Sequence, residues 1–162
     1  MIRKIEIFDL ASIQKITTVS WNETYRGIVP NEFLDELFIN EEDRINKLTN
    51  KYEEIKDNYL VLDIESNVVG FVKYGKSNEY ENYGEIYALY ILKEYQGYGY
   101  GKLLVNEGIK NIKDMGYNKM IISCLEGNKA NDFYKHIGGI CKEKRIFKLL
   151  NLPENVYFFE NI

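Results

Sequence analysis

Apolar residues in the first third of the chain recur at helical spacing after a short alternating start. The segment 2–8 is rich in isoleucine and predicts an opening strand, and Asp9 is the candidate N-cap of the helix that follows. Gly27 and Pro30 break that helix, and Asn31 is the candidate cap of the next one. The predicted helices cover residues 10–25, the segment from after Asn31 to Phe38, and residues 41–55.

Alternation and glycine punctuation dominate the rest of the chain. Two strands joined around Ser66 and Asn67 predict a hairpin. The segment 85–92 is apolar at nearly every position after Glu85, which predicts a central strand buried on both faces. The predicted strands are 59–64, 68–74, 85–92, 119–125, 140–149 and 155–160, and the predicted helices are 102–115 and 129–137.

This order of elements predicts an α/β (α+β) domain. About six or seven strands would form a central mixed, mostly antiparallel sheet, flanked by about four or five helices. Prolines occur only at positions 30 and 153, and neither a repeat nor a Gly/Ser-rich tract appears. We therefore expect residues 1–162 to form a single domain.

Composition narrows the class of protein. Lys+Arg 21 against Asp+Glu 25 gives a net charge of −4, which argues against a nucleic-acid binder. The two cysteines, Cys124 and Cys141, exclude a disulfide-stapled scaffold, and we expect both to be buried, inert thiols. Neither a signal peptide nor an apolar run of about 18 residues is present, so we expect a cytoplasmic protein without membrane contact.

A turn with alternating glycines is the candidate ligand-binding segment of the chain. Gly97, Gly99 and Gly101 lie between the strand 85–92 and the helix from Lys102. Such a turn opens the backbone to a ligand, and the first N–H groups of the helix point at it, which suits a phosphate or diphosphate. Walker A and Rossmann turns share this physics, but their glycine spacings do not match.

The segment resembles the acyl-CoA diphosphate loop of the GCN5-related N-acetyltransferase (GNAT) family, Q/R-x-x-G-x-G/A, at Gln96, Gly99 and Gly101. A second segment, residues 128–139, is similar to the family's N-x-A-x-x-F-Y-x-x-x-G-F motif. Gly139 replaces its last Phe, so we expect looser packing there. Residues 21–30 resemble the W-x-x-T-Y-x-G-I-x-P stretch of small bacterial members, so the resemblance covers essentially the whole chain and implies a GNAT-like fold.

The resemblance implies acetyl-CoA as the acyl donor, bound by a strand end, the glycine turn and the second motif. The backbone N–H of Ile91 would stabilise the oxyanion of the thioester carbonyl. Lys102 would either reach a phosphate of CoA or stay solvated, and Asn128 would cap its helix and also bond the CoA arm. The implied cofactor-binding residues are Leu89, Ile91, Gln96, Gly97, Tyr98, Gly99, Tyr100, Gly101, Lys102, Asn128 and Tyr134.

The resemblance also implies catalytic roles. Tyr134 occupies the position of the general acid that protonates the leaving thiolate, although Phe133 and Tyr134 would equally suit a core. Glu85 is the first candidate for the general base and Glu126 the second. The histidine of the chain, His136, lies on another helix face and is expected in solvent or in a structural bond.

The acceptor side is implied by the third stretch. Trp21, Tyr25 and Arg26 are the candidate substrate-binding residues: the rings would hold an ammonium group or an aliphatic stem, and Arg26 a carboxylate. Core packing is the alternative for Trp21. The charged runs 41–43 and 142–145 predict solvated faces, and no residue cluster has metal-ligand spacing.

We therefore expect direct transfer of an acetyl group from acetyl-CoA to a primary amine in a ternary complex. The alternatives are an acyl-CoA-binding regulator without turnover and, less well matched, a nucleotide-binding module. The sequence does not identify the amine acceptor. Dimers are common among GNAT proteins, so a homodimer stays open, and the aromatic segment 156–159 would serve either as core or as an interface.

Overall fold

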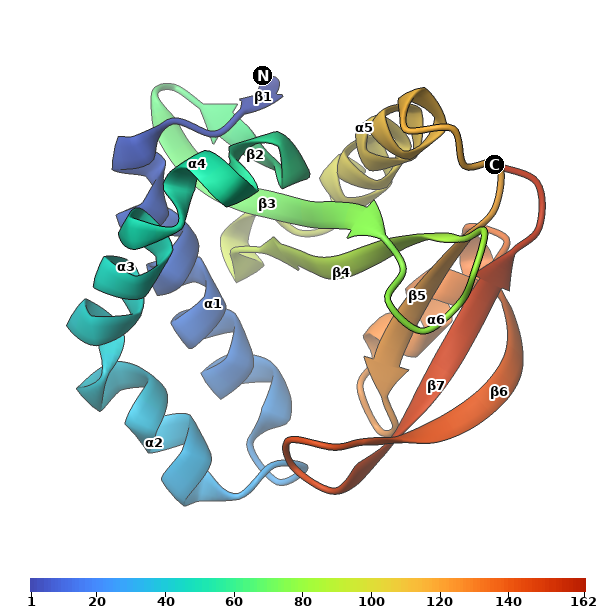
Figure 1. The fold of residues 1–162 in the computed structure, drawn as a ribbon. Coiled ribbons are helices and arrows are strands. Elements are labelled where there is room, and N and C mark those ends of the chain that lie inside the picture. Colours follow the sequence, from blue (N-terminus) through green and yellow to red (C-terminus); the bar gives the residue numbers. More distant parts are fainter. The chain divides into compact units, whose positions relative to one another are not determined.

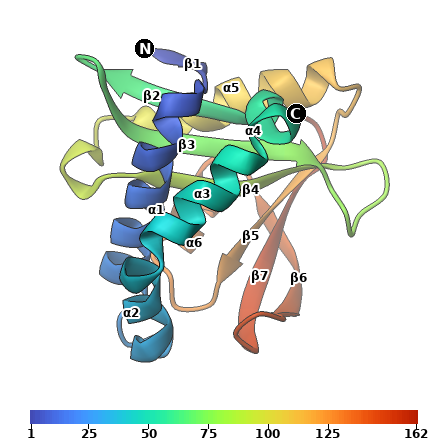
Figure 2. The same ribbon diagram turned by 60° about the vertical axis from the view of Figure 1, so that its left-hand side comes forward.

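The computed structural model describes all residues, 1–162, and Figures 1 and 2 show the course of the chain. The strands are β1 (Ile2–Lys4), β2 (Tyr59–Ile64), β3 (Asn67–Lys76), β4 (Gly84–Ile91), β5 (Met120–Leu125), β6 (Ile140–Phe147) and β7 (Leu152–Phe159). The α-helices are α1 (Leu10–Tyr25), α2 (Asn31–Ile39), α3 (Glu41–Asn50), α4 (Tyr52–Ile55), α5 (Tyr100–Asp114) and α6 (Ala130–His136). Short 3₁₀ turns cover Ile7–Asp9, Lys56–Asn58 and Lys93–Tyr95.

The strands form one mixed seven-stranded sheet in the order β1-β2-β3-β4-β5-β7-β6. The pairs β1–β2, β2–β3, β5–β7 and β6–β7 are antiparallel, whereas β4 and β5 run parallel. The predicted mostly antiparallel sheet is confirmed. The α-helices number six because the predicted helix 41–55 divides at Lys51 into α3 and α4.

The chain divides into two compact units. The first unit consists of Met1–Lys73 and Ala88–Glu107, and the second of Tyr74–Tyr87 and Gly108–Ile162. Three elements, β3, β4 and α5, continue from one unit into the other.

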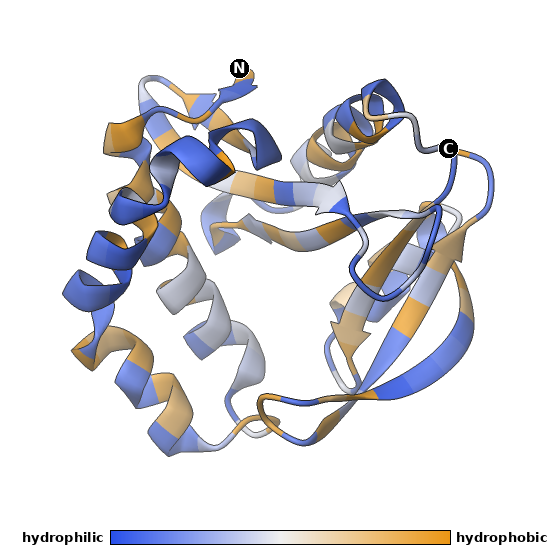
Figure 3. Ribbon diagram, viewed as in Figure 1, coloured by the Kyte–Doolittle hydropathy of each residue, from blue (hydrophilic) through white to orange (hydrophobic).

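The core of the first unit lies between α1 and the strands β2 and β3. Leu10, Ile13 and Ile16 on one stripe of α1 pack with buried side chains of the strands, among them Val61 and Phe71. The helix α3 contributes Leu48 to the edge of this cluster and contains no fully buried residue. It is accordingly blue over most of its length in Figure 3, as expected of a charged helix on the surface.

The core of the second unit is built on β5 and β7. Ile121, Val156 and Phe158 are buried together, and the rings of Tyr80 and Tyr83 pack on them. All four residues of segment 156–159 are buried within this unit, so the core alternative for that segment is confirmed. Gly84 at the start of β4 leaves room for Ile112, whose Cγ2 would lie 2.3 Å from a Cβ at position 84.

Two predicted features of the first unit are wrong, the length of the opening strand and the cap of α2, and a third is confirmed only in position. The opening strand ends at Lys4, because the chain turns at Ile7–Asp9 and leaves the side chains of Ile7 and Phe8 exposed. Asp9 is the N-cap residue of α1 as predicted, but its carboxylate makes no capping bond and instead accepts from the N–H of Glu6 and from Arg3. Asn31 is the first residue of α2 rather than its cap.

Two features of the strands also differ from expectation. The turn of the β2–β3 hairpin is Glu65-Ser66, both with positive φ, so it lies one residue earlier than predicted. The strand β4 is central in the sheet order but buried on both faces only over Gly84–Ile86, the residues that pair with β5. From Tyr87 onward its side chains are exposed or half-buried, an arrangement that apolar composition alone does not reveal.

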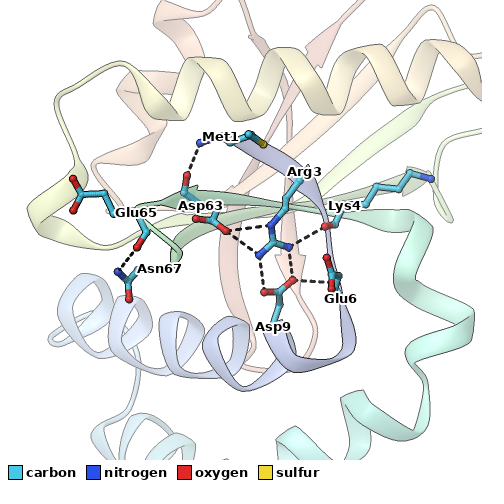
Figure 4. Close-up of polar contacts among 8 residues, drawn as sticks. All are labelled: Met1, Arg3, Lys4, Glu6, Asp9, Asp63, Glu65 and Asn67. Carbon is cyan, nitrogen blue, oxygen red and sulfur yellow. Dashed lines mark hydrogen bonds and ion pairs between the residues drawn. The ribbon is translucent and has the colours of Figure 1, made fainter.

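A polar cluster fastens the start of the chain (Figure 4). The guanidinium of Arg3 donates to both carboxylate oxygens of buried Asp9, at 2.7 and 3.0 Å, and also to Asp63 at 3.0 Å. Asp9 additionally accepts a 2.7 Å bond from the N–H of Glu6. These bonds hold β1, the first 3₁₀ turn and β2 together. None of the helices combines the length and the apolar character that a membrane crossing requires.

Candidate active site

The first unit holds the strand end and the glycine turn that were predicted to bind CoA. Past the end of β4, the N–H of Leu92 donates to the carbonyl of Val69, at 2.9 Å. The side-chain amide of Gln96 donates a 2.8 Å bond back to the carbonyl of Ile91. Gln96 therefore fixes the turn against the strand end. Gln96 and Ile91, which were both predicted to bind CoA, lie close together in the structure.

The backbone of the turn is open at its glycines. Gly97 and Gly99 have φ values of +85° and +84°, and no atom lies within 4 Å of a Cβ built at either position. The helix α5 begins at Tyr100, so Gly101 and Lys102 lie in its first turn, and the Lys102 side chain is exposed. The first N–H groups of a helix have no partner within the helix, and the positive end of its dipole lies there. The geometry suits a diphosphate, as the sequence predicts.

The same unit contains a close approach of β3 to β4. A Cβ at Gly70 would lie 2.8 Å from the carbonyl oxygen of Tyr90 and 2.9 Å from a side-chain carbon of Ile91. A side chain at position 70 would therefore force β3 and β4 apart, and only glycine avoids this. Glycine at position 70 therefore allows the end of β4 at Tyr90 and Ile91 to lie close to β3.

The predicted acceptor residues lie at the end of α1. The ring of Trp21 packs against Tyr25, with centroids 4.6 Å apart, and against Phe33 of α2 at 5.7 Å. Trp21 is half-buried, and its Nε1–H donates a 2.7 Å bond to the hydroxyl of Tyr90. Trp21 thus combines packing with a polar tie to β4, the strand that carries Leu89 and Ile91.

Arg26 is engaged with neighbouring side chains. Its guanidinium donates to Asp35 and Asn22, at 2.6 Å each, and to Asn31 at 3.2 Å. Binding of an acceptor carboxylate by Arg26 stays a prediction, and it would require this arrangement to open.

The second unit holds the predicted acid. Asn128 lies just before α6, and its Oδ1 accepts a 2.8 Å bond from the N–H of Ala130, so the expected side-chain contact at the helix start is present. Tyr134 is buried, with 7% of its surface exposed, and its ring packs against Phe133 and Tyr157 with centroids 5.5 and 5.9 Å apart. The packing of a core aromatic is therefore present, and the acid role stays a prediction.

A buried amide that the sequence analysis missed holds α6 in place. Asn131 donates to the carbonyls of Leu125 and Asn128, at 2.9 and 2.7 Å. Its oxygen accepts from Asn155 at 3.0 Å and from the hydroxyl of Tyr157 at 2.8 Å. All four hydrogen-bonding sites of the amide are used, which orients the helix that carries Tyr134.

The expected loosening at Gly139 is wrong. A Cβ at position 139 would lie 2.7 Å from the ring of Phe159 and 2.8 Å from the carbonyl oxygen of Tyr134. The ring of Phe159 on β7 fills the space beside the glycine, and the N–H of Gly139 donates a 2.9 Å bond to that carbonyl. The departure from the motif is compensated by packing from another strand.

Glu85, the first candidate for the base, is buried in the second unit with 6% of its surface exposed. The hydroxyl of Ser77 donates a 2.8 Å bond to its Oε2. Burial raises the pKa of Glu85 above its usual range, whereas the bond from Ser77 and the charge of Arg145 oppose that shift. A carboxylate held in this way is suited to accept a proton.

The remaining candidates of the sequence analysis are the second possible base, the histidine and the two cysteines. Glu126 is exposed and forms a 2.6 Å ion pair with Lys144, while His136 is exposed as expected. Burial raises the pKa of the Cys124 thiol to about 12, which fits an inert thiol. Cys141, however, is exposed because β6 is the edge strand of the sheet, so its predicted burial is wrong.

Arg145 corrects the prediction that the run 142–145 is a solvated face. Its Nε donates to buried Glu154 at 2.7 Å and its Nη2 to Ser123 at 2.8 Å, and its Nη1 bonds Glu79. Its guanidinium also lies over the ring of Tyr80. No sequence signal distinguishes Arg145 from the exposed lysines beside it, because its partners come from three other segments.

The predicted site residues are divided between the two units. The glycine turn, the strand end and Trp21 belong to the first unit, whereas Glu85, Asn128 and Tyr134 belong to the second. No group of three or more His, Cys, Asp or Glu side chains is arranged to hold a metal ion.

Comparison with known proteins identifies the class. The model of the acetyltransferase (GNAT) family matches residues 16–138. The chain is 31% identical over 137 residues to the uncharacterized N-acetyltransferase YuaI of Bacillus subtilis (strain 168), which covers 83% of this chain and 76% of the relative. The chain therefore belongs to the acetyltransferase (GNAT) family and is an acetyl-CoA-dependent N-acetyltransferase, as the motifs indicate.

Two further similar proteins come from Thermoplasma acidophilum. A spermidine N(1)-acetyltransferase is 31% identical over 119 residues, 71% of each chain. The crystal structure of the PaiA N-acetyltransferase in complex with coenzyme A has a TM-score of 0.77 at 22% identity, with 98% of each chain covered. This likeness confirms the predicted GNAT fold.

Proposed function

We propose that this enzyme transfers the acetyl group of acetyl-CoA directly to a primary amine within a ternary complex. The amine nitrogen attacks the thioester carbonyl, the C–N bond forms and the C–S bond breaks. The ammonium proton passes to Glu85, and the CoA thiolate takes a proton from Tyr134. The observation that carries the proposal is the turn at Gly97 and Gly99, tied back to the strand end by Gln96 and continuing into α5.

The donor is held by the first unit in this proposal. The N–H groups at the start of α5 bind the diphosphate, because the glycines keep side-chain atoms out of the way. The strand end at Leu89 and Ile91 binds the pantetheine arm, and the N–H of Ile91 stabilises the oxyanion. Tyr98, which is exposed beside the turn, and Asn128 complete the set of CoA contacts that we propose.

Glu85 supplies the base. An alkylamine with a pKa near 10.4 is about 3.4 units from neutral pH, so the scarcity of the free base costs about 4.6 kcal/mol. A buried carboxylate that accepts the proton, directly or through a water molecule, removes part of this barrier. Burial raises the pKa of Glu85 and thereby makes it a better proton acceptor than an exposed carboxylate.

Tyr134 supplies the acid. A phenol with a pKa near 10 can donate to a thiolate, whose conjugate acid has a pKa of about 8.5 by analogy with cysteine, once water is excluded. The burial of Tyr134 and the fixed orientation of α6 by Asn131 support this role, because both keep the hydroxyl in one place.

The acceptor that we propose is a cationic alkylamine of the polyamine class. The relative from Thermoplasma acidophilum named spermidine N(1)-acetyltransferase supports this class, as does the net charge of −4. The rings of Trp21 and Tyr25, which pack against each other at a tilt, suit an ammonium group or an aliphatic stem. The proposal further places the enzyme in the cytoplasm and leaves a homodimer to be tested by its mass in solution.

The test has two parts. Calorimetric titration with CoA, ATP and NAD is expected to give binding with CoA alone. Acetyl-CoA consumption is then followed with spermidine, a free amino acid, an aminoglycoside and a peptide amine, and spermidine is expected to be acetylated fastest. Binding of CoA without turnover on any amine would favour the regulator, and faster acetylation of the peptide would overturn the polyamine class.

A further inference from the structure

The loop between β3 and β4, residues 77–83, is organised around the side chain of Ser77. Ser77 follows the last residue of β3 and is 2% exposed. Its N–H donates a 2.9 Å bond to the carbonyl of Tyr83, which closes the loop. The loop therefore returns the chain into β4 directly before Glu85.

The hydrogen bonds of the Ser77 hydroxyl fix the direction in which its proton points. The oxygen accepts from the N–H of Tyr80 at 3.2 Å and from the N–H of Glu79 at 3.4 Å. A hydroxyl has two acceptor sites and one proton, so both acceptor sites are taken and only the proton remains. That proton is donated to Oε2 of Glu85, at 2.8 Å.

This arrangement distinguishes the two protonation states of Glu85. A carboxylate accepts the proton of Ser77 without conflict. A carboxylic acid that carried its proton on Oε2 would face a hydroxyl oxygen whose acceptor sites are already used. Because Ser77 engages Oε2, the other oxygen, Oε1, is left to receive a proton.

Four other charged or titratable groups face this carboxylate. Arg145 of β6 favours its ionised form, whereas Glu79 of the loop and Glu154 of β7 disfavour it. Tyr87 of β4 is influenced by the charge of Glu85. Arg145 binds both acidic neighbours, so its single positive charge offsets part of their negative charge, and the bond from Ser77 is the direct contact that Glu85 receives.

We infer that Ser77 is the positioning residue of the general base: it holds Glu85 ionised by a bond to Oε2 and directs Oε1 to the incoming ammonium proton. The inference rests on the proposed role of Glu85. Ser77 itself touches neither substrate, and the connection is made through Glu85 alone.

The experiment compares the native enzyme with S77A, S77T and S123A. S77A removes the proton donor, S77T keeps a hydroxyl, and S123A removes a hydroxyl from the same polar network without contact to Glu85. The first readout is the NMR titration of the Glu85 carboxyl with ¹³C-labelled glutamate, whose signal is assigned with E85Q. This readout requires neither an acceptor nor activity.

We expect S77A to lose its Glu85 proton at higher pH than the native enzyme, and S77T and S123A to titrate as the native enzyme does. The second readout is the pH profile of kcat/KM with spermidine or, if another amine of the panel is faster, with that amine. On the acid limb of this profile, the kcat/KM of S77A should be about tenfold lower than that of the native enzyme, which is the loss expected for one hydrogen bond to a charged group. An unchanged titration in S77A overturns the inference.

The two proposals fail in different ways. If E85Q keeps full activity and the native pH profile, Glu85 is not the base, and the inference falls with it. If E85Q is inactive while S77A titrates and reacts as the native enzyme does, only the role of Ser77 is overturned. If S77A does not fold, the inference is tested by the NMR titration of the native protein alone. A Glu85 carboxyl that is protonated at pH 7.5 then contradicts the inference.

Discussion

The indole of Trp21 and the hydroxyl of Tyr90 are joined by a hydrogen bond of 2.7 Å. It connects the end of α1, where the acceptor is proposed to bind, with the residue between Leu89 and Ile91 on β4. One hydrogen bond therefore connects the helix end that is proposed to bind the acceptor with the strand end that is proposed to bind the donor.

Tyr90→Phe should disturb the acceptor side more than the donor side. Without its acceptor the half-buried indole N–H loses about 1 kcal/mol of hydrogen bonding, and Trp21 is less firmly oriented. We expect kcat/KM for the amine to fall about fivefold and the affinity for acetyl-CoA, measured by calorimetry, to stay within twofold. Tyr52→Phe, which removes a weak 3.4 Å bond elsewhere in the same unit, is the control. An equal effect of both variants would contradict a specific role of this pair.

Tyr134→Phe tests the general acid. Loss of a positioned acid typically slows turnover by about a hundredfold or more, whereas the ring and its packing against Tyr157 are retained. We expect that decrease in kcat, from steady-state kinetics, with acetyl-CoA affinity unchanged. Tyr83→Phe, which removes a hydroxyl bonded to Glu160, should leave kcat as it is. A Tyr134→Phe enzyme with native turnover would exclude the acid role.

Gly99→Ala tests the open turn. Ala pays a conformational cost of about 1 kcal/mol at φ +84°, and its methyl group projects where the diphosphate is proposed to lie. We expect acetyl-CoA affinity to fall at least tenfold in a calorimetric titration. Gly116→Ala is a matched control, because Gly116 has φ +93° and equally open surroundings but ends α5. It should lower the melting temperature to a similar extent and leave the affinity unchanged. Equal affinities of the two variants would argue against diphosphate binding at this turn.

Arg3→Met tests the cluster in Figure 4. The substitution leaves the carboxylate of Asp9 buried without its guanidinium partner, which typically costs about 3 kcal/mol. Urea denaturation should show that loss in the free energy of unfolding. Lys4→Met removes the neighbouring ion pair with Asp57, whose two side chains are exposed, and should leave the free energy of unfolding nearly unchanged. Similar losses in both variants would show that burial of Asp9 does not matter.

Glu160 should give the protein part of its acid sensitivity. Bonds from Lys142, Tyr83 and Lys119 lower the pKa of Glu160 from 4.5 to about 2. Because the folded state holds this carboxylate ionised more strongly than the unfolded state, its contribution to stability is present above pH 4.5 and is lost as the pH falls toward 2.

The check is the melting temperature between pH 7 and pH 2. Glu160→Gln should lower it at pH 7 and weaken its decrease below pH 4.5, so that the two curves converge in acid. Glu42→Gln, at an exposed position of α3, should follow the native curve. A native-like curve for Glu160→Gln would disprove this assignment.

Local sequence determined the elements that we propose to bind the donor. The alternating glycines, the strand before them and the helix after them depend on residues close in sequence, and the structure has all three. The same holds for the helix that carries Tyr134, which begins and ends within one residue of its predicted bounds. Spacing and motif together were sufficient to identify the family, because both are properties of short segments.

The tertiary structure alone decided which side chains meet. Ser77 and Glu85 are close in the chain, but the loop that joins them bears no signal of its own, and Trp21 and Tyr90 are 69 positions apart. The half-buried position of Arg145 within a charged run, and the filling of the space beside Gly139 by Phe159, depend on strand register. Hydrophobic periodicity fixes which face of an element is buried, whereas a polar contact depends on where two distant backbones come to lie.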